Sequence, residues 1–446
     1  MKQEIINFFN NKKIAILGFG LEGQSTYNFI RNNVPNKTLT IIDKNNQRDK
    51  IPNDLETNII YGETYLNDLD KYDIIMKTPG INLKTIDTNN IRNKIYSQLE
   101  IILKFNAKNI IGITGTKGKS TTTSLIYNIL KDQLDNVFLA GNIGIPIFDE
   151  ISNYDSQSIL VIEMSSHQLE YVDKSPHIGI ILNLYEDHLD FAGTVDYYHA
   201  CKLNMFKNQD ENDIAIYCSD CETLKNKVLN NHYKAKQYQV ELEYNQNCVS
   251  LKGNKIYYKE ECLYEDDNQR KILGQHNLEN IMVAILVAKI YNLDLQKAKK
   301  SIDTFKGLEN RLEYSGTYND IIYYCDTIAT IPEATISGIK ALKNVNTLII
   351  GGMDRGINYT PLIDFLNQST IKNLICMPST GYKIAKQITN PSINIILAET
   401  LDLAVENAKK FTEKNTICLL SPAASSYEYF KNYIEKGNKF KELIKE

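Results

Sequence analysis

The sequence predicts an α/β protein of three domains, the central one built on a parallel sheet. The chain has 446 residues, which corresponds to about three domains at roughly 150 residues each. Apolar runs of strand length alternate with helical patterns along most of the chain. Two of these runs lead directly into glycine-rich turns, an arrangement typical of nucleotide-binding α/β domains.

Composition excludes several classes of protein. Hydrophobic residues make up 43% and charged residues 23%, near globular averages, and a net charge of -4 offers no general attraction to nucleic acid. No apolar run approaches the roughly 18 residues that cross a bilayer. The eight cysteines form no dense framework, and the single CxxC of Cys218 and Cys221 is interpreted as two structural thiols. We expect a cytoplasmic, monomeric protein without nucleic-acid or membrane partners.

The first domain is expected at residues 1–106 and is Rossmann-like. A strand at 13–17 leads through a glycine-rich turn into a helical pattern around 27–31, which begins a βαβ unit. Further strands are predicted at 38–42 and 72–76, the last one closed by Thr78, Pro79 and Gly80.

The second and third domains are expected at residues 107–310 and 311–446. The second resembles P-loop ATPase domains in its strand, loop and helix order. Its predicted elements are strands at 109–114, 158–162 and 178–184, a helix through 130, a small β excursion at 238–264 and a helix at 280–291. The third is again Rossmann-like, with strands predicted at 321–325, 347–350, 373–377, 393–397 and 416–420.

The strongest chemical signal is a phosphate-binding loop between a strand and a helix. It comprises Gly115, Thr116, Lys117, Gly118, Lys119, Ser120 and Thr121. Backbone N–H groups and the helix dipole of such a loop face an anion. Lys119 is expected to reach the outer phosphates of ATP, and the hydroxyl of Ser120 to bind Mg²⁺. The alternative is an ordinary glycine turn. The first glycine of the longer pattern would fall at Ile113, so this is the shorter GxxGKS form.

A second glycine pattern lies near the N-terminus. Gly18, Gly20 and Gly23 follow a strand, and Asp43 stands at the end of the next strand. This fingerprint indicates a dinucleotide site, although the same turn can bind any diphosphate or be purely structural.

Acidic residues and a histidine follow two buried strands of the second domain. Glu163 closes one strand, the position from which an acidic side chain of phosphate-loop enzymes reaches the metal. His188 stands among three carboxylates past the next strand, where a metal or phosphate role is favoured over a solvated loop. Imidazole is an unusual ligand for Mg²⁺, which prefers oxygen.

Several separated motifs together resemble the Mur ligases over essentially the whole chain. They are GTKGKST at 115–121, GNIG at 141–144, EMSSHQL at 163–169, EDHLD at 186–190, GQHN at 274–277, SPAASS at 421–426 and FKNY at 430–433. Agreement of many motifs in order is far more specific than any one of them.

The resemblance implies an ATP-dependent ligase that joins D-glutamate to UDP-N-acetylmuramoyl-L-alanine through an acyl phosphate, with Mg²⁺. It assigns the UDP portion to the first domain, at Leu21, Glu22, Asp43, Pro79 and Gly80. The fingerprint would thus still bind a diphosphate, but that of UDP and not that of a dinucleotide.

The resemblance also assigns the reacting centre. Asn142, Ser165 and His188 match contacts to the muramoyl end and its metal, and Lys202 matches a lysine that is carbamylated in the family. The implied catalytic residues are Lys119, Glu163, His188 and Lys202; the implied metal ligands are Ser120, Glu163, His188 and carbamylated Lys202. The implied nucleotide contacts are Asn277, Asn280, Arg311 and Asp326, and those to the amino acid are Arg355 and Ser426.

Three departures from the family pattern keep alternatives open. Ile328 replaces a common lysine, Ile331 replaces an asparagine, and Arg355 stands where lysine is frequent. An L-glutamate-adding relative is therefore an alternative, as is a ligase like folate polyglutamate synthase, which the extra N-terminal nucleotide domain disfavours. A nicotinamide oxidoreductase would leave Lys119, Glu163 and His188 without a task, and an ATP-gated binding module would not need them arranged around a metal.

Overall fold

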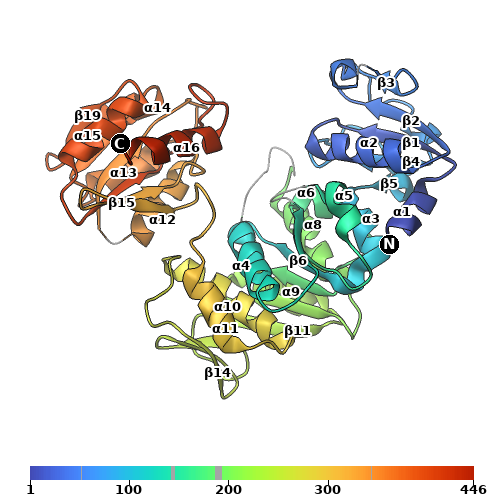
Figure 1. The fold of residues 1–446 in the computed structure, drawn as a ribbon, viewed down its shortest axis with the longest axis horizontal. Helices are drawn as coiled ribbons and strands as arrows, with labels where there is room; N and C mark the ends of the chain where they lie inside the picture. The colour runs from blue at the N-terminus through green and yellow to red at the C-terminus, as the bar shows by residue number, and fades with distance from the viewer. Residues whose placement is uncertain (52, 142–145, 186–192, 343) are drawn as a thin grey trace. The chain divides into compact units, whose positions relative to one another are not determined.

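The computed structural model describes residues 1–446 except 52, 142–145, 186–192 and 343. The chain divides into two compact units (Figure 1). One contains Met1–Asp267 and Glu279–Ile302, and the other contains Asn268–Leu278 and Asp303–Glu446. Within the described ranges, no helix is long and apolar enough to cross a membrane.

The first unit begins with a five-stranded parallel sheet in the order β3-β2-β1-β4-β5. Its strands are β1 (Lys12–Leu17), β2 (Lys37–Ile42), β3 (Asn58–Ile60), β4 (Ile74–Lys77) and β5 (Ile95–Tyr96). Its helices are α1 (Lys2–Phe9), α2 (Leu21–Asn33) and α3 (Gln98–Asn106). This strand order puts β1, which leads into the Gly18 turn, in the centre of the sheet.

The two faces of this sheet are covered differently. Side chains of α1, α2 and α3, including Phe9, Phe29 and Leu99, pack with Ile14 and Ile16 in one apolar cluster. The other face carries alternate strand residues under loop residues such as Leu69, Tyr72 and Leu83. Alternation of side chains along each strand produces these two clusters.

The same unit continues with a nine-stranded sheet in the order β14-β13-β12-β11-β10-β9-β6-β8-β7. Its parallel strands are β6 (Ile110–Thr114), β7 (Val137–Gly141), β8 (Ile159–Glu163), β9 (Ile178–Ile181), β10 (Ile214–Cys218), β11 (Lys236–Glu241) and β12 (Val249–Lys252). The antiparallel end is formed by β13 (Lys255–Tyr258) and β14 (Glu261–Glu265). All of β6 is buried, as expected for a central parallel strand.

Helices connect the strands of the nine-stranded sheet. They are α4 (Lys119–Lys131), α5 (Ile147–Glu150), α6 (Ser166–Leu169), α8 (Val195–Lys207) and α9 (Glu222–Asn231), followed by α10 (Gln275–Ile290) and α11 (Leu295–Thr304). The connection from β6 through α4 lies at the carboxyl end of the central strands, where open α/β sheets bind ligands.

The second unit holds a six-stranded sheet in the order β15-β16-β20-β17-β18-β19. Its strands are β15 (Glu313–Tyr318), β16 (Ile321–Cys325), β17 (Val345–Ile350), β18 (Asn373–Cys376), β19 (Asn394–Leu397) and β20 (Ile417–Leu420). Only β15 runs antiparallel to its neighbour. Its helices are α12 (Pro332–Ala341), α13 (Thr360–Asn367), α14 (Thr380–Ala385), α15 (Leu401–Phe411) and α16 (Tyr433–Leu443).

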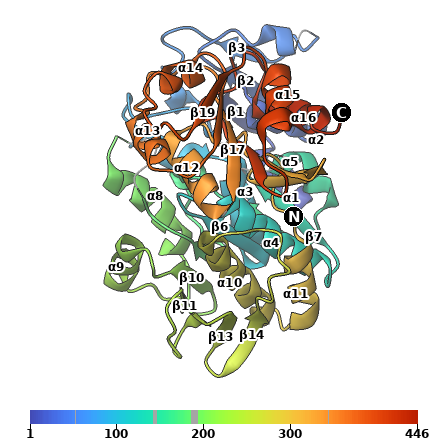
Figure 2. The same ribbon diagram turned by 90° about the vertical axis from the view of Figure 1, so that its left-hand side faces the viewer.

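Helices cover both faces of this third sheet (Figure 2). Residues of α15 and α16 form one apolar cluster, with Val405 and Phe440 against Tyr323. Residues of α12, α13 and α14 form the other, with Leu362 against Leu348. The sheet is therefore a three-layer, doubly covered α/β unit.

The predicted α/β class is confirmed, with three mainly parallel sheets. The strands β3, β5, β7, β10 and β15 were not predicted. Four of them, β3, β5, β7 and β15, lie at sheet edges. The strands β3 and β5 have three and two residues, which is too short for a hydrophobic period. Each sheet lies within one of the three expected ranges, while the boundaries near 106 and 310 stay predictions.

The thiols agree with the sequence interpretation. All eight cysteines are free, and Cys262 is the exposed one. Both cysteines of the CxxC are buried, and burial raises the pKa of the Cys218 thiol well above its ordinary value.

Candidate active site

The phosphate loop joins β6 to α4 through two residues that must be glycine. Gly115 has φ 151° and Gly118 has φ 84°, a region that side chains disfavour. A Cβ on Gly118 would lie 2.8 Å from Asn280 Oδ1, and a Cβ on Gly115 would lie 3.1 Å from Leu182 Cβ. The loop therefore turns tightly against neighbouring side chains, and the first-turn N–H groups of α4 face its concave side.

Asn183, just past β9, holds the loop in shape. Its Oδ1 accepts hydrogen bonds from Thr116 N at 3.0 Å and Lys117 N at 2.8 Å, and its Nδ2 donates to Lys117 O at 3.2 Å. We call these three hydrogen bonds the Asn183 clasp. They occupy the two loop N–H groups, so the N–H groups at the N-terminus of α4 are left to bind an anion. The sequence analysis missed this role, although the position at the end of a predicted strand was a usable signal.

Replacing Asn183 by alanine is expected to raise KM for ATP ~10-fold or more, because three hydrogen bonds of ~0.5–1.5 kcal/mol each are lost from the loop. The measurement is a steady-state titration of ATP, with Asn226→Ala on the surface helix α9 as control. An unchanged KM for ATP would show that the loop keeps its shape without the clasp.

Lys119 and Ser120 occupy the first turn of α4. Lys119 Nζ donates to Gly115 O at 2.9 Å and to Thr116 O at 3.0 Å, so its ammonium lies across the loop. Ser120 and Thr121 are buried in the same turn. This arrangement suits the phosphate and metal roles predicted for them.

Two further predicted catalytic residues lie at this loop. Lys202, on α8, is 1% exposed, and its Nζ donates to Gly115 O at 2.9 Å and lies 4.7 Å from the centroid of the Tyr198 ring. Glu163 ends β8, is 1% exposed and pairs in register with Ile113 of β6. The structure thus brings Lys202 and the strand that carries Glu163 to the loop, while their catalytic roles stay predictions.

The donors present suit Mg²⁺. The carboxylate of Glu163 and the hydroxyl of Ser120 are oxygen ligands, which this ion prefers. Within the described ranges, no three His, Cys, Asp or Glu side chains gather in a metal-binding group. His188 and Asn142 lie outside the described residues, and their assigned roles stay predictions.

Of the predicted nucleotide contacts on α10, Asn280 lies at the loop. Its Oδ1 accepts a hydrogen bond from Thr122 Oγ1 at 3.0 Å, and it flanks Gly118. Asn277 is buried and its Nδ2 donates to Leu273 O at 2.7 Å. Only Asn280 of this pair belongs to the first unit.

The N-terminal fingerprint is a close-packed turn. A Cβ on Gly18 would lie 2.2 Å from Thr78 Oγ1, and a Cβ on Gly23 would lie 2.2 Å from Gly18 O. Asp43 Oδ2 accepts a hydrogen bond from Phe19 N at 2.8 Å. The Asp43 carboxylate therefore orders the turn itself, in addition to any contact with a ligand.

The other residues assigned to the UDP portion surround this turn. Leu21 is 82% exposed, Pro79 is half-buried and Gly80 is exposed. Burial raises the pKa of the Glu22 carboxyl to about 7. Hydrogen bonds with the backbone of Gln98 and the side chain of Gln168 partly oppose this rise. An acid with this pKa is about half protonated at neutral pH, so on average it repels an anionic ligand less than a full carboxylate does.

In the second unit, Asp326 follows β16 at the carboxyl end of the sheet. Its Oδ2 accepts from Ser421 Oγ at 2.9 Å and its Oδ1 from Leu312 N at 3.1 Å. Burial raises the pKa of Asp326 to about 7, which these hydrogen bonds and the nearby Arg311 charge oppose. Asp326 and Arg311, both predicted at the nucleotide, are thus close enough to interact.

The residues predicted to contact the amino acid come from two adjacent loops of the same unit. Met353 N donates to Ser425 O at 2.9 Å, which joins the segment carrying Arg355 to the segment carrying Ser426. Arg355 donates to Thr330 O at 2.9 Å. The buried Lys436, missed by the sequence analysis, supports the first loop by donating to Gly351 O at 2.9 Å.

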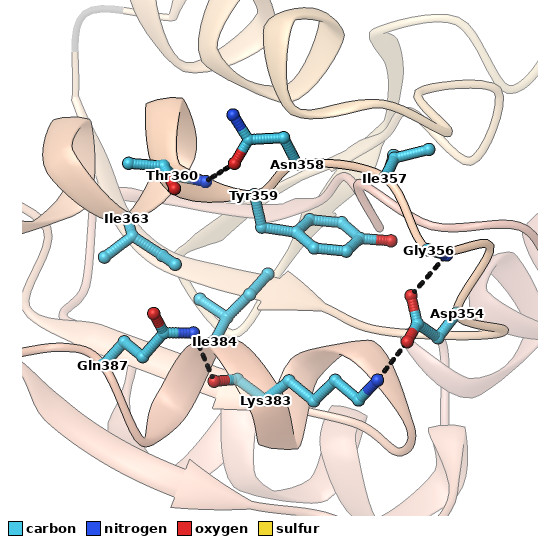
Figure 3. A pocket seen from close by; sticks show the side chains of 10 residues that line it. All are labelled: Asp354, Gly356, Ile357, Asn358, Tyr359, Thr360, Ile363, Lys383, Ile384 and Gln387. Carbon is cyan, nitrogen blue, oxygen red and sulfur yellow. Dashed lines mark hydrogen bonds and ion pairs between the residues drawn. The ribbon is translucent and has the colours of Figure 1, made fainter.

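A cavity of about 280 Å³ opens beside this loop (Figure 3). The ion pair between Asp354 and Lys383 lines it, together with the apolar side chains of Ile363 and Ile384. Asp354 also accepts from Gly356 N at 3.0 Å. These contacts order the segment around Arg355.

Comparison with known proteins defines the class of enzyme. The family model described as Mur ligase middle domain matches residues 113–288, which include the phosphate loop, Glu163 and Lys202. A UDP-N-acetylmuramoylalanine–D-glutamate ligase of Clostridium kluyveri is 31% identical over 98% of this chain and 97% of its own length. The chain therefore belongs to the Mur ligases, ATP-dependent enzymes that form amide bonds.

Further relatives and solved structures agree. The ligase of the same name from Clostridium botulinum is 31% identical, again over 98% of this chain and 97% of its own. The MurF ligase of Thermotoga maritima in complex with ADP has a TM-score of 0.60 at 17% identity, covering 99% of this chain and 96% of that one. The UDP-N-acetylmuramate–alanine ligase of the same organism has a TM-score of 0.57 at 17% identity, covering 97% and 98%. At these identities the structural likeness concerns the fold.

Proposed function

We propose that this enzyme adds D-glutamate to UDP-N-acetylmuramoyl-L-alanine at the expense of ATP. The observation that carries the proposal is 31% identity over 98% of the chain to ligases named for this reaction. The phosphate loop supports the use of ATP, because Lys119 and Lys202 both donate hydrogen bonds to its backbone carbonyl groups.

In the proposed reaction, a carboxylate oxygen of the precursor attacks the γ-phosphorus of ATP, and the bond to ADP breaks. The glutamate amine then attacks the acyl carbon of the resulting acyl phosphate, and inorganic phosphate leaves. The N-terminus of α4 and Lys119 would hold the phosphate oxygens and oppose their developing charge. Asn183 would keep the loop shaped for this task.

We further propose that Ser120, Glu163, His188 and carbamylated Lys202 hold Mg²⁺. The bound ion would neutralise phosphate charge and orient the phosphoryl group. Carbamylation would turn the buried ammonium of Lys202 into a carboxylate, and an oxygen ligand suits the ion better than a cation does. The cytoplasmic location and monomeric state expected from the sequence stay predictions.

The enantiomer of glutamate is the point that Ile328 and Ile331 leave open. Ile331 is 41% exposed at the start of α12, and Ile328 is half-buried. Arg355 is a cation of the same unit, and its hydrogen bond to Thr330 O holds it beside the segment of Ile328 and Ile331. We expect it to bind the amino-acid carboxylate.

The test measures phosphate release with ATP, Mg²⁺ and UDP-N-acetylmuramoyl-L-alanine, separately with D- and L-glutamate. Release with D-glutamate alone is expected. Release with L-glutamate alone would convert the proposal to an L-glutamate ligase. Release with neither, from protein that binds ATP, would refute the proposed substrates.

A further inference from the structure

A buried ion pair joins the two sheets of the first unit. Lys77 ends β4 of the five-stranded sheet, and Glu170 directly follows α6 beside the nine-stranded sheet. Lys77 Nζ lies 3.5 Å from Glu170 Oε2, and the side chains are 3% and 2% exposed. Charges this deeply buried are little screened by water, so the pair strongly restricts the distance between its two segments.

At one end, Glu170 is fixed to the segment that carries Ser165. Tyr197 Oη on α8 donates to Glu170 Oε1 at 2.7 Å. The helix α6 is one turn long and begins with a capping box in which Ser165 and Gln168 bond reciprocally. Because Ser165 and Glu170 terminate the same short turn, holding Glu170 also holds Ser165.

At the other end, Lys77 is fixed to the glycine fingerprint. Its neighbour Thr78 donates from both N and Oγ1 to Leu17 O, at 3.0 and 3.1 Å, and lies directly against Gly18. Lys77 Nζ lies 3.5 Å from Thr78 O. The ammonium therefore sits at the base of the turn that is assigned to the UDP portion.

A second link runs parallel to the ion pair. Glu22, in the first turn of α2, has the Gln168 side chain as a hydrogen-bond partner and is close enough to Lys77 to feel its charge. Thus the fingerprint helix and the Ser165 turn meet through neighbouring polar contacts.

We propose that the Lys77–Glu170 ion pair is a positioning pair that sets the separation between the two halves of the precursor site, the fingerprint turn and the Ser165 turn. The proposal rests on the proposed function, which assigns the UDP portion to the first and the muramoyl end to the second. Neither residue is required to touch the precursor. A ligand that uses only one half does not depend on the pair, whereas a ligand that spans both does.

An exposed ion pair between the turn before β5 and the segment that follows Glu170 provides a control. Arg92, before β5, lies 3.4 Å from Asp173, with side chains 38% and 73% exposed. Exposed pairs of this kind constrain little, since water and salt screen them. Asp173→Asn should therefore leave ligand binding unchanged.

The decisive variant removes both buried charges together. Lys77→Met alone would leave Glu170 as an uncompensated buried charge and could unfold the unit. The double variant Lys77→Met/Glu170→Gln keeps the volume and leaves no such charge. Calorimetry without ATP then measures the affinity of two ligands, UDP and UDP-N-acetylmuramoyl-L-alanine, for wild type, the double variant and Asp173→Asn.

The expected result is a split between the two ligands. The double variant should bind UDP within about twofold of wild type but the precursor at least ~10-fold more weakly, and kcat at saturating precursor should change less than KM. A merely structural role would weaken both ligands equally. Equal loss of both, or precursor affinity equal to wild type, would overturn the proposal.

One further variant and the wild-type measurement complete the test. Tyr197→Phe removes only the hydroxyl group that donates to Glu170 and leaves the ion pair in place, so it covers the case of an unfolded double variant. It is expected to weaken precursor binding a few-fold and UDP binding not at all; unchanged precursor binding would contradict the proposal. Wild-type protein that fails to bind the precursor would refute the proposed function instead.

Discussion

Replacing Lys119 by alanine is expected to lower kcat at least ~1,000-fold, because one preorganised cation facing a transferring phosphoryl group contributes on this scale. The ammonium lies across Gly115 O and Thr116 O at the N-terminus of α4. In the variant, the backbone cradle keeps its shape through Asn183, so the nucleotide still binds. The measurement is phosphate release under saturating ATP and both acceptor substrates.

The matched control is Lys131→Ala, which removes an exposed lysine from the last turn of the same helix. It should keep full activity and the same melting temperature. A Lys119→Ala enzyme with near-normal kcat would remove this loop from the chemistry. A large loss of ATP affinity in place of kcat would assign Lys119 to ground-state binding.

Replacing Lys202 by methionine is expected to lower kcat at least ~100-fold, because the loop loses a buried charged group that contacts Gly115 O. Methionine nearly preserves the side-chain volume, so the packing of Tyr198 against this position is kept. Lys207→Met, at the exposed end of the same helix, is the control and should retain activity.

The carbamate can be measured separately from the lysine. Intact-mass measurement of wild-type enzyme kept in bicarbonate should show one added carbon dioxide that the Lys202→Met variant lacks. Dialysis against buffer free of carbon dioxide should lower wild-type activity, and bicarbonate should restore it. Activity that is indifferent to carbon dioxide would mean that Lys202 acts as an ammonium, through its bond to the loop.

Local pattern was sufficient to predict the phosphate loop. Gly115, Gly118 and Lys119 are close in sequence, and their roles follow from one strand, one turn and one helix. The fold class followed for the same reason, because continuous apolar runs such as 110–114 occur where a parallel strand is buried on both faces. The short edge strands bury too little apolar surface to leave such a signal.

The contacts that shape the site could not be predicted in the same way. Asn183 and the loop N–H groups that it binds are 66 or 67 residues apart, and Lys77 and Glu170 are further apart still. A buried lysine looks like any surface lysine in sequence, since only its partner makes burial tolerable. Lys202 was assigned by resemblance alone, and the structure shows it buried against the loop.

The clasp by Asn183 also bears on the order in which a growing chain can acquire activity. The loop leaves the ribosome well before Asn183, because β7 and β8 lie between them in the chain. The strand β9, which leads to Asn183, can pair with β6 only after both have been made. A nascent or truncated chain ending before residue 183 would carry the complete GTKGKST segment without the side chain that holds its backbone. Such a fragment should therefore bind ATP more weakly than the finished enzyme.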